Sequence, residues 1–164
     1  MSALAMVAMV VATAAAEPPS DPLADCAPKS LPAAINCLDK HLPMETKAKF
    51  VGGSFRDVVL WHHGLGTWIR NNWGLWGGGP LRDDLQGLGL SHPDDMSGVI
   101  LETYWLQSHQ CPIQVPLQVA YYRAYWDEIQ AAEKAAKAGH RNMKMPMPGP
   151  RPNLDCTAGA APND

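Results

Sequence analysis

The chain lacks the charge excess and the strand patterns that would place it in several common classes of protein. Its 164 residues carry 13 lysines and arginines against 16 aspartates and glutamates, which gives a net charge of -3. Proteins that bind nucleic acid usually carry a strongly basic face, so nucleic acid is not an expected partner. No segment alternates apolar and polar residues for long enough to demand a β-sheet. The composition therefore favours an all-α fold.

The sequence also lacks the short motifs that mark common enzymes and metal sites. It contains no H-E-x-x-H, no G-x-S-x-G and no C-x-x-C, which are typical of zinc peptidases, serine hydrolases and zinc or redox sites. The glycine run at residues 77–79 lacks the lysine and serine of a phosphate-binding loop. We therefore expect no cofactor, and catalysis is not the favoured function.

The first 16 residues, MSALAMVAMVVATAAA, are uncharged and end in three alanines before Glu17. The run is too short to span a bilayer, and small residues at its end are typical of a signal-peptide cleavage site. An apolar N-terminal helix is the alternative, because no lysine or arginine precedes the run. We predict a signal peptide over residues 1–16, a periplasmic or secreted mature protein, and no stable membrane span after cleavage.

Three further segments follow the predicted signal peptide. Residues 17–29 hold four prolines and are interpreted as a linker. Residues 30–139 contain the periodic apolar positions and form the predicted helical domain. Residues 140–164 are rich in proline and poor in large apolar side chains other than methionine. We expect this last segment to be a flexible tail.

The cysteines are even in number, which fits an exported protein, because disulfides form in oxidising compartments. Cys26, Cys37, Cys111 and Cys156 allow three connectivities, and their spacing alone does not choose among them. We favour the pairs Cys26–Cys37 and Cys111–Cys156. The second bridge would close a loop of about 45 residues and tie the tail to the domain.

Apolar residues recur at intervals of three and four along much of the domain, which indicates amphipathic helices. Two start signals are strong: Ser54 can cap a helix, and the segment S-H-P-D-D at residues 91–95 combines a cap, a proline and two carboxylates. The helix that starts there is apolar on both sides, which is typical of a central helix. The predicted helices span residues 31–42, 43–52, 55–63, 92–108 and 116–138. They would form a small irregular bundle of about five helices with a proline-rich C-terminal tail.

The stretch WHHGLGTWIRNNWGLWGGG at residues 61–79 holds four tryptophans. On a helical wheel, one face is shared by Trp61, Leu65, Trp68, Ile69, Asn72 and Trp76, so most of these aromatic side chains are predicted to be core. Asn72 lies in the middle of this face, where a buried carboxamide would need backbone partners from a neighbouring loop. Gly64 and Gly66 predict a break or a close helix approach.

Two segments of the chain resemble a known family. LG-x-WIRNNWGLW and HPDDMSG-x-IL are similar to motifs of a small bacterial domain of unknown function, found in short and often exported proteins. The resemblance covers about residues 31–107 and implies no activity. This chain departs from the family at the turn Gly78-Gly79-Pro80, and the family usually ends soon after the helix of Trp105. The long helix and the tail therefore lie outside the resemblance.

Polar residues of the two motifs make the candidate site. A guanidinium can hold a carboxylate in a bidentate fork, so Arg70 can lock the first motif to the helix start in the second. That role alone would explain the cluster structurally. Trp73 and Trp105 lie off the main apolar stripes, and exposed aromatic side chains commonly receive sugars or a partner's side chains. The candidate binding residues are Arg70, Asn71, Asn72, Trp73, His92, Asp94, Asp95 and Trp105.

Two functional interpretations stand beside the structural one. In the favoured interpretation, the domain is a non-enzymatic binding module of the bacterial envelope, and its partner is an unknown protein or envelope ligand. In the alternative, His92, Asp94 and Asp95 join His62 or His63 in a metal-dependent hydrolase. The spacing of these residues matches no established metal motif, which weighs against the alternative.

Overall fold

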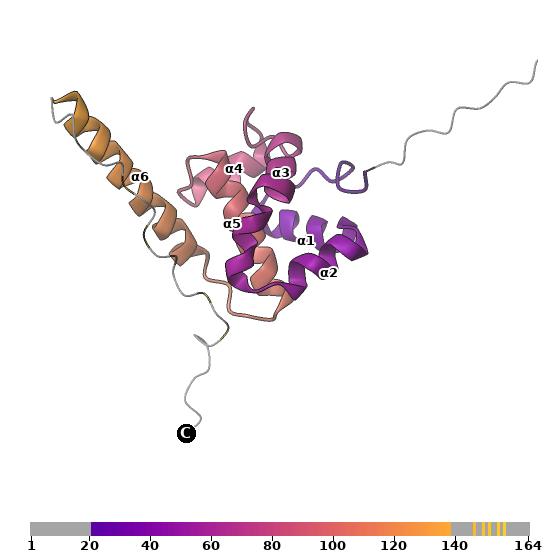
Figure 1. Ribbon diagram of the computed structural model, residues 1–164. Helices are drawn as coiled ribbons and strands as arrows, with labels where there is room; N and C mark the ends of the chain where they lie inside the picture. The colour runs from indigo at the N-terminus through magenta and orange to yellow at the C-terminus, as the bar shows by residue number, and fades with distance from the viewer. Residues whose placement is uncertain are drawn as a thin grey trace, which may run out of the picture.

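The computed structural model describes residues 21–138 and, beyond them, Pro146, Gly149, Arg151, Leu154 and Cys156. The described part is built from helices and contains no strand, so the all-α prediction is confirmed (Figure 1). The predicted signal peptide and most of the predicted tail lie outside the described residues. In chain order the elements are α1 (Leu31–His41), α2 (Met44–Gly52), the 3-10 helix η1 (Phe55–Trp61), the π-helical turn η2 (His62–Gly66), α3 (Thr67–Asn72), α4 (Pro80–Gly87), α5 (Pro93–Ser108) and α6 (Val115–Lys137).

Local sequence explains where several of these helices begin. Ser30 caps α1, because its hydroxyl accepts a hydrogen bond from the backbone N–H of Ala33 at 3.4 Å. Ser54 and Asp57 form a capping box at the start of η1. His92 caps α5 through Nδ1, which accepts from the N–H of Asp94 at 3.2 Å. The predicted start of the helix at the HPDD motif is therefore confirmed.

Helix α5 is the centre of the bundle, as its two apolar faces predict. Twelve of its 16 residues are buried, and it contacts every other helical element of the described part. Figure 1 shows α1, α2, α3 and α4 gathered around it. Four of its polar residues are buried with it, namely Asp95, Ser97, Glu102 and Thr103. Because a buried polar group needs a partner, the surroundings of α5 hold most of the polar chemistry described below.

The tryptophan stretch does not form the continuous helix that the wheel assumes, so two predictions are wrong. The π-helical turn η2 places an extra residue in one turn, and α3 ends at Asn72 before Gly74, whose φ is +74°. Asn72 is consequently exposed and donates to the carbonyl oxygen of Trp68 in its own helix, at 2.8 Å. Trp76 falls in the following loop and is 52% exposed. The break predicted from Gly64 and Gly66 is confirmed.

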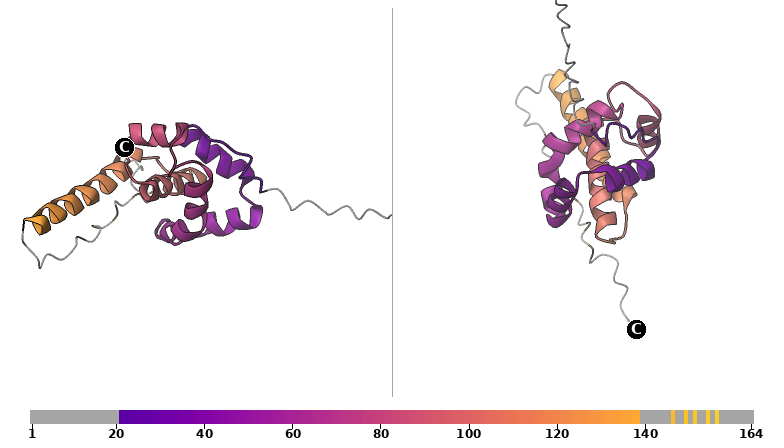
Figure 2. Two further views of the ribbon diagram at one scale, coloured as in Figure 1. Left: turned by 90° about the horizontal axis from the view of Figure 1, so that it is seen from above. Right: turned by 90° about the vertical axis from the view of Figure 1, so that its right-hand side faces the viewer.

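Helix α6 packs against α5 with its first half and extends away from the bundle with its second half (Figure 2). Its buried residues toward the bundle include Gln118, Val119 and Tyr122, whereas most of residues 131–137 are exposed. The last helical turns carry alanine, glutamate and lysine, which offer little apolar surface to bury.

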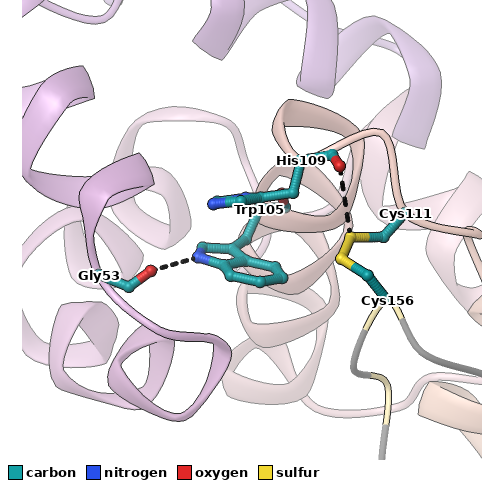
Figure 3. The surroundings of a disulfide bond; sticks show 5 residues. All are labelled: Gly53, Trp105, His109, Cys111 and Cys156. Carbon is teal, nitrogen blue, oxygen red and sulfur yellow. Dashed lines mark hydrogen bonds between the residues drawn. A yellow bond between two sulfur atoms is a disulfide. The ribbon is translucent and has the colours of Figure 1, made fainter.

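Both favoured disulfides are present, Cys26–Cys37 and Cys111–Cys156. The first joins the N-terminal segment to α1. The second joins the loop between α5 and α6 to the C-terminal segment (Figure 3). Close to this second bridge, the ring of His109 stacks on Trp105 with centroids 3.8 Å apart. The bridge therefore fixes Cys156 beside the end of the central helix.

Candidate functional site

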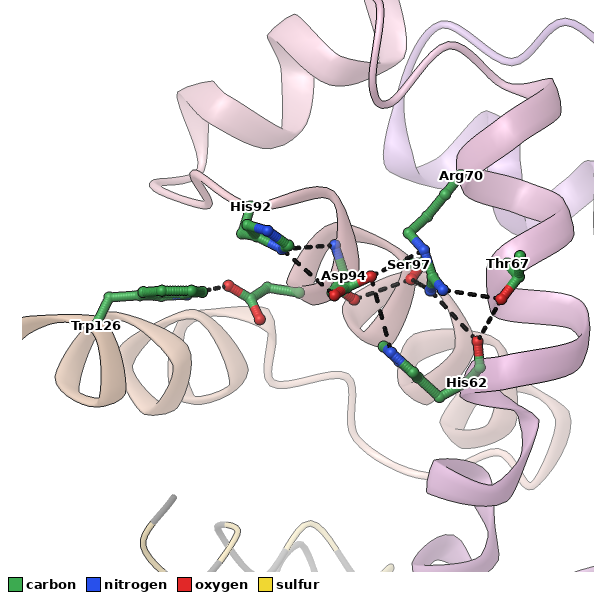
Figure 4. Close-up of polar contacts among 8 residues, drawn as sticks. His62, Thr67, Arg70, His92, Asp94, Ser97 and Trp126 are labelled. Carbon is green, nitrogen blue, oxygen red and sulfur yellow. Dashed lines mark hydrogen bonds and ion pairs between the residues drawn. The ribbon is translucent and has the colours of Figure 1, made fainter. Parts of the chain in front are cut away.

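Arg70 is the anchor of the polar cluster at the start of α5. It is only 6% exposed, and its Nε lies 2.9 Å from Asp94 Oδ1. Its terminal nitrogens donate to Ser97 Oγ at 2.8 Å, to Thr67 Oγ1 at 2.9 Å and to the carbonyl oxygen of His62 at 3.3 Å (Figure 4). One nitrogen meets the carboxylate, so the predicted bidentate fork is wrong. The guanidinium instead ties η2, α3 and α5 together.

The glycine of η2 leaves room for this anchor. A Cβ at Gly66 would lie 3.2 Å from Arg70 Nη1 and 3.4 Å from the carbonyl oxygen of Trp61. Few real Cβ contacts are that close, so the guanidinium would have to shift by a few tenths of an ångström to admit a side chain here. The glycine of the first motif, Gly66, therefore leaves space for the Arg70 side chain.

Two histidines lie beside Asp94 without forming a metal site. His62 Nε2 is 3.8 Å from Asp94 Oδ1, and His92 Nδ1 is 3.6 Å from Asp94 Oδ2. Burial, and then the charge of Arg70, lowers the pKa of His62, so it is neutral at pH 7. The cation that Asp94 meets is therefore Arg70. Within the part of the chain that the structure describes, no three His, Cys, Asp or Glu side chains are grouped so that they could hold a metal ion.

Four of the predicted binding residues lie outside this cluster. Asn71 and Asn72 are both exposed. Trp73 and Trp105 are each 7% exposed, so the prediction that they offer exposed rings is wrong. Trp105 belongs to the hydrophobic core, and its Nε1 donates to the carbonyl oxygen of Gly53 at 2.9 Å (Figure 3). A helical wheel does not show that α3 ends at Asn72, so that Trp73 lies beyond the helix.

Asp95 bonds to a residue of α6. It is 7% exposed, and its Oδ2 accepts a hydrogen bond from Trp126 Nε1 at 2.5 Å (Figure 4). Burial raises the pKa of this carboxyl above its usual value of 3.8, although the Trp126 bond and His92 oppose the shift. No hydrogen bond from a described residue reaches its Oδ1. The two neighbouring aspartates therefore have different surroundings and different roles.

A pocket of about 160 Å³ opens beside Asp95, between the loop that precedes α5 and the side of α6. Trp126 and Tyr122 supply aromatic walls, and Arg123, Asp127 and Gln130 supply polar ones. None of these α6 residues was among the predicted site residues. Their only sequence signal is the aromatic stripe of a helix outside the family resemblance, and nothing in that stripe shows that it faces Asp95.

Three aromatic side chains continue from this pocket across the loop region. The His92 ring lies 5.2 Å from Trp126 and 5.8 Å from Trp76, measured between ring centroids. Trp76 is the most exposed of the three, as described above. Aromatic rings of this kind supply rigid contact area at low conformational entropy, and one exposed at the mouth of a pocket is suited to a ligand. We refer to Trp76, His92 and Trp126 as the aromatic ledge.

The contact between α5 and α6 is a ladder of hydrogen bonds. Beyond the Asp95–Trp126 bond, Tyr122 Oη donates to Glu102 Oε1 at 3.2 Å, and Thr103 Oγ1 donates to Gln118 Oε1 at 3.2 Å. Gly98 allows the helices to cross closely, because a Cβ there would lie 2.4 Å from Tyr122 Oη. In this chain, the glycine of the HPDDMSG motif therefore makes the close packing of α5 against α6 possible.

The fold and the site describe a small helical domain with two disulfides and a polar pocket at the start of its central helix. Residues 27–107 match the model of a family described as a domain of unknown function (DUF6794). The match agrees with the resemblance drawn from the two motifs and ends within α5, before α6 begins. Neither a curated protein nor a solved structure matches the chain.

The disulfides bear on where the protein is found. The two disulfides are compatible with an extracellular or secreted protein, since such bonds persist in oxidising compartments. Among the residues that the structure describes, no helix has the length and apolar content needed to cross a membrane.

Proposed function

We propose that the protein is exported to the bacterial envelope and acts there as a non-enzymatic binding module. The binding site consists of the pocket beside Asp95 and the aromatic ledge, with Asp94 at its margin. The ligand is a protein or another envelope molecule that presents a polar group with hydrogen-bond donors. The signal-like residues 1–16 and the paired cysteines support export.

The observation that carries this proposal is the position of Asp95. Asp95 is 7% exposed, and its Oδ2 accepts the hydrogen bond from Trp126 Nε1. The other oxygen belongs to a residue that lines the pocket. A donor group of a ligand would complete the hydrogen bonding of Asp95 and would lie against the Trp126 ring. Asp95 thus presents a hydrogen-bond acceptor at the pocket, where a donor group of a ligand can take the place of water.

The size of the pocket limits the ligand. Sites for complete small molecules usually enclose about 300–1,000 Å³, whereas this pocket has about 160 Å³. It suits one side chain or one sugar ring, with the rest of the ligand lying on the ledge. A large cofactor would not fit.

The geometry does not favour the metal-dependent hydrolase. Asp94, the carboxylate nearest to both histidines, is already paired with the Arg70 cation. His92 uses Nδ1 to cap α5, so that nitrogen is not free for a metal. A divalent cation would have to displace a buried guanidinium, which would leave Arg70 without its counter-charge.

The Trp126 indole N–H provides a direct reporter for the test. We would titrate the ¹⁵N-labelled mature chain with N-acetylglucosamine and with lysinamide, and follow the indole signal by NMR. At least one probe should shift this signal in a saturable manner. Asp95→Asn keeps an oxygen that can accept from Trp126, and it should weaken the binding at least tenfold while the other indole signals stay in place.

Two controls separate this proposal from its alternatives. Trp76→Leu should weaken binding without changing stability, because the side chain lies in an exposed loop. Mn²⁺ should leave the His62 and His92 signals unbroadened. If neither probe shifts the Trp126 signal, or if Asp95→Asn binds as tightly as the wild type, the proposed site is wrong. Selective broadening of both histidines by Mn²⁺ would favour the hydrolase instead.

A further inference from the structure

A second buried carboxylate of α5, Glu102, meets an arginine from the C-terminal segment. Glu102 is 3% exposed, and its Oε1 accepts from Tyr122 Oη and forms an ion pair with Arg151. The guanidinium carbon of Arg151 lies 5.8 Å from the centre of the Tyr121 ring and 5.9 Å from that of Tyr122. A carboxylate with aromatic rings within about 6 Å is the surrounding that guanidinium groups prefer.

The segment that supplies Arg151 is held at two further points. Leu154 is 2% exposed and belongs to the hydrophobic core. Cys156 is joined to Cys111 by the second disulfide. Two side chains of this segment therefore contact the domain, Arg151 at Glu102 and Leu154 in the hydrophobic core, and their spacing in the sequence is R-x-x-L. Both places would be open if this segment left, and no other ion pair to Glu102 comes from the described residues.

We infer that Glu102, Tyr121 and Tyr122 form a binding site for an arginine side chain in an R-x-x-L segment of a partner polypeptide, and that Arg151 and Leu154 occupy this site in cis. The site shares Tyr122 with the pocket beside Asp95, but Glu102 and Tyr121 do not line that pocket, and the inference does not depend on the function proposed for it.

Three physical arguments support this assignment. A buried carboxylate whose cation is removed is strongly unfavourable, so a cation from another chain would be favoured at Glu102 when Arg151 leaves. Arginine is preferred to lysine, because its planar guanidinium stacks on aromatic rings and loses less hydration. A bare amino acid would fill only the first place, whereas a polypeptide with leucine three residues later also fills the place of Leu154.

The occupant in cis explains why the site is closed in the intact chain. A ligand tethered by a short linker acts at an effective concentration of the order of millimolar. The disulfide at Cys156 shortens the tether further, because Leu154 lies only two residues from a fixed point. A free peptide with micromolar affinity would therefore compete poorly until the tail is released.

The test uses the full chain and a fluorescein-labelled peptide, PGPRPNLD, which reproduces residues 148–155. Binding is measured by fluorescence anisotropy for the wild type, for a variant without the bridge (Cys111→Ser, Cys156→Ser), and for a variant that also carries Arg151→Ala. The last variant should bind the peptide at least tenfold more tightly than the wild type. The variant without the bridge is the matched control and should lie between the two.

The chemistry of the site is tested in the released variant. Adding Glu102→Gln should weaken peptide binding at least tenfold, and Tyr121→Leu, which keeps apolar contact without the ring, is the second probe if the glutamine variant does not fold. Peptides with citrulline for the arginine, or with alanine for the leucine, should bind at least tenfold more weakly.

Three outcomes would overturn the inference. The released variant could bind the peptide no better than the wild type. The citrulline peptide could bind as well as the arginine peptide, which would show that no charge is recognised. Finally, free argininamide could displace the peptide at concentrations near the Kd of the peptide itself, which would assign the site to the free amino acid.

Discussion

Replacement of Arg70 by methionine should strongly destabilise the domain. Methionine keeps most of the apolar stem but removes the guanidinium, which contacts Asp94, Ser97, Thr67 and the carbonyl of His62. Breaking a buried charge pair usually costs about 3–5 kcal/mol. The groups that Arg70 contacts keep other hydrogen bonds when the guanidinium is removed. Ser97 Oγ, for example, still donates to the carbonyl oxygen of Asp94 at 2.9 Å. We therefore expect Arg70→Met to lower the free energy of unfolding by about 3 kcal/mol, at the lower end of this range.

The matched control is Asp94→Asn. Its amide oxygen can still accept from Arg70, and the side chain of Asp94 is 39% exposed, so solvent screens the lost charge. We expect about 1 kcal/mol for this change. The difference between the two variants separates the value of the guanidinium as a connector of three elements from the value of the ion pair.

Urea unfolding followed by tryptophan fluorescence gives both free energies by linear extrapolation. Since domains are stable by about 5–15 kcal/mol, a loss of about 3 kcal/mol is easily measured. The reasoning is refuted if Arg70→Met costs less than about 1 kcal/mol, or if Asp94→Asn costs as much as Arg70→Met. The second result would mean that the ion pair, and not the connection of η2, α3 and α5, stabilises this region.

Three further predictions follow from the contacts of α5 and from the bridges. Gly98→Ala should destabilise by about 1–3 kcal/mol, because its Cβ would meet the Tyr122 hydroxyl, and Tyr122→Phe in the same chain should restore part of the loss in a double-mutant cycle. The pKa of Asp95 is raised on folding, so its contribution to stability is largest below the unfolded value of 3.8 and falls as pH rises through the raised pKa. Asp95→Asn should remove this fall. The urea midpoints of the variant and of the wild type, measured from about pH 3 to pH 7, should therefore diverge as the pH rises, and parallel curves would contradict the prediction. Cys156→Ser should lower the free energy of unfolding by about 4 kcal/mol and Cys37→Ser by about 3 kcal/mol, because the two bridges close loops with separations of 45 and 11 residues. If urea unfolding gives the reverse order for the two variants, loop entropy is not the cause.

The positions of the helices could be predicted from the sequence more completely than the side chains that are exposed on the surface. The period of the apolar residues and the caps at Ser30, Ser54 and His92 depend on neighbours within one turn, so their effect can be read locally. For the same reason α5 was recognised as the central helix from its two apolar faces. The contact of Arg70 with Asp94 was also anticipated, because two motifs with opposite charges invite it, although the bidentate geometry was not found.

The tertiary structure decided which aromatic side chains are exposed. A wheel assumes one continuous helix, but η2 and the end of α3 rotate and stop it, so Trp73 is buried and Trp76 is not. The two glycines predicted that the helix would break, but they did not predict which tryptophan side chains would be buried after the break. Trp105 shows the same limit, since its burial follows from the approach of Gly53 more than fifty residues earlier.

The candidate sites, too, were decided by tertiary contacts. Asp94 and Asp95 are adjacent in the sequence and chemically identical, yet one faces Arg70 and the other faces Trp126. Which carboxylate faces the pocket is set by the docking of α6, and Glu102 meets Arg151 only because the C-terminal segment returns to the bundle. Local periodicity carries no record of contacts between residues 30 to 50 positions apart. The sequence by itself therefore fixes the elements, and packing selects the residues that are available for function.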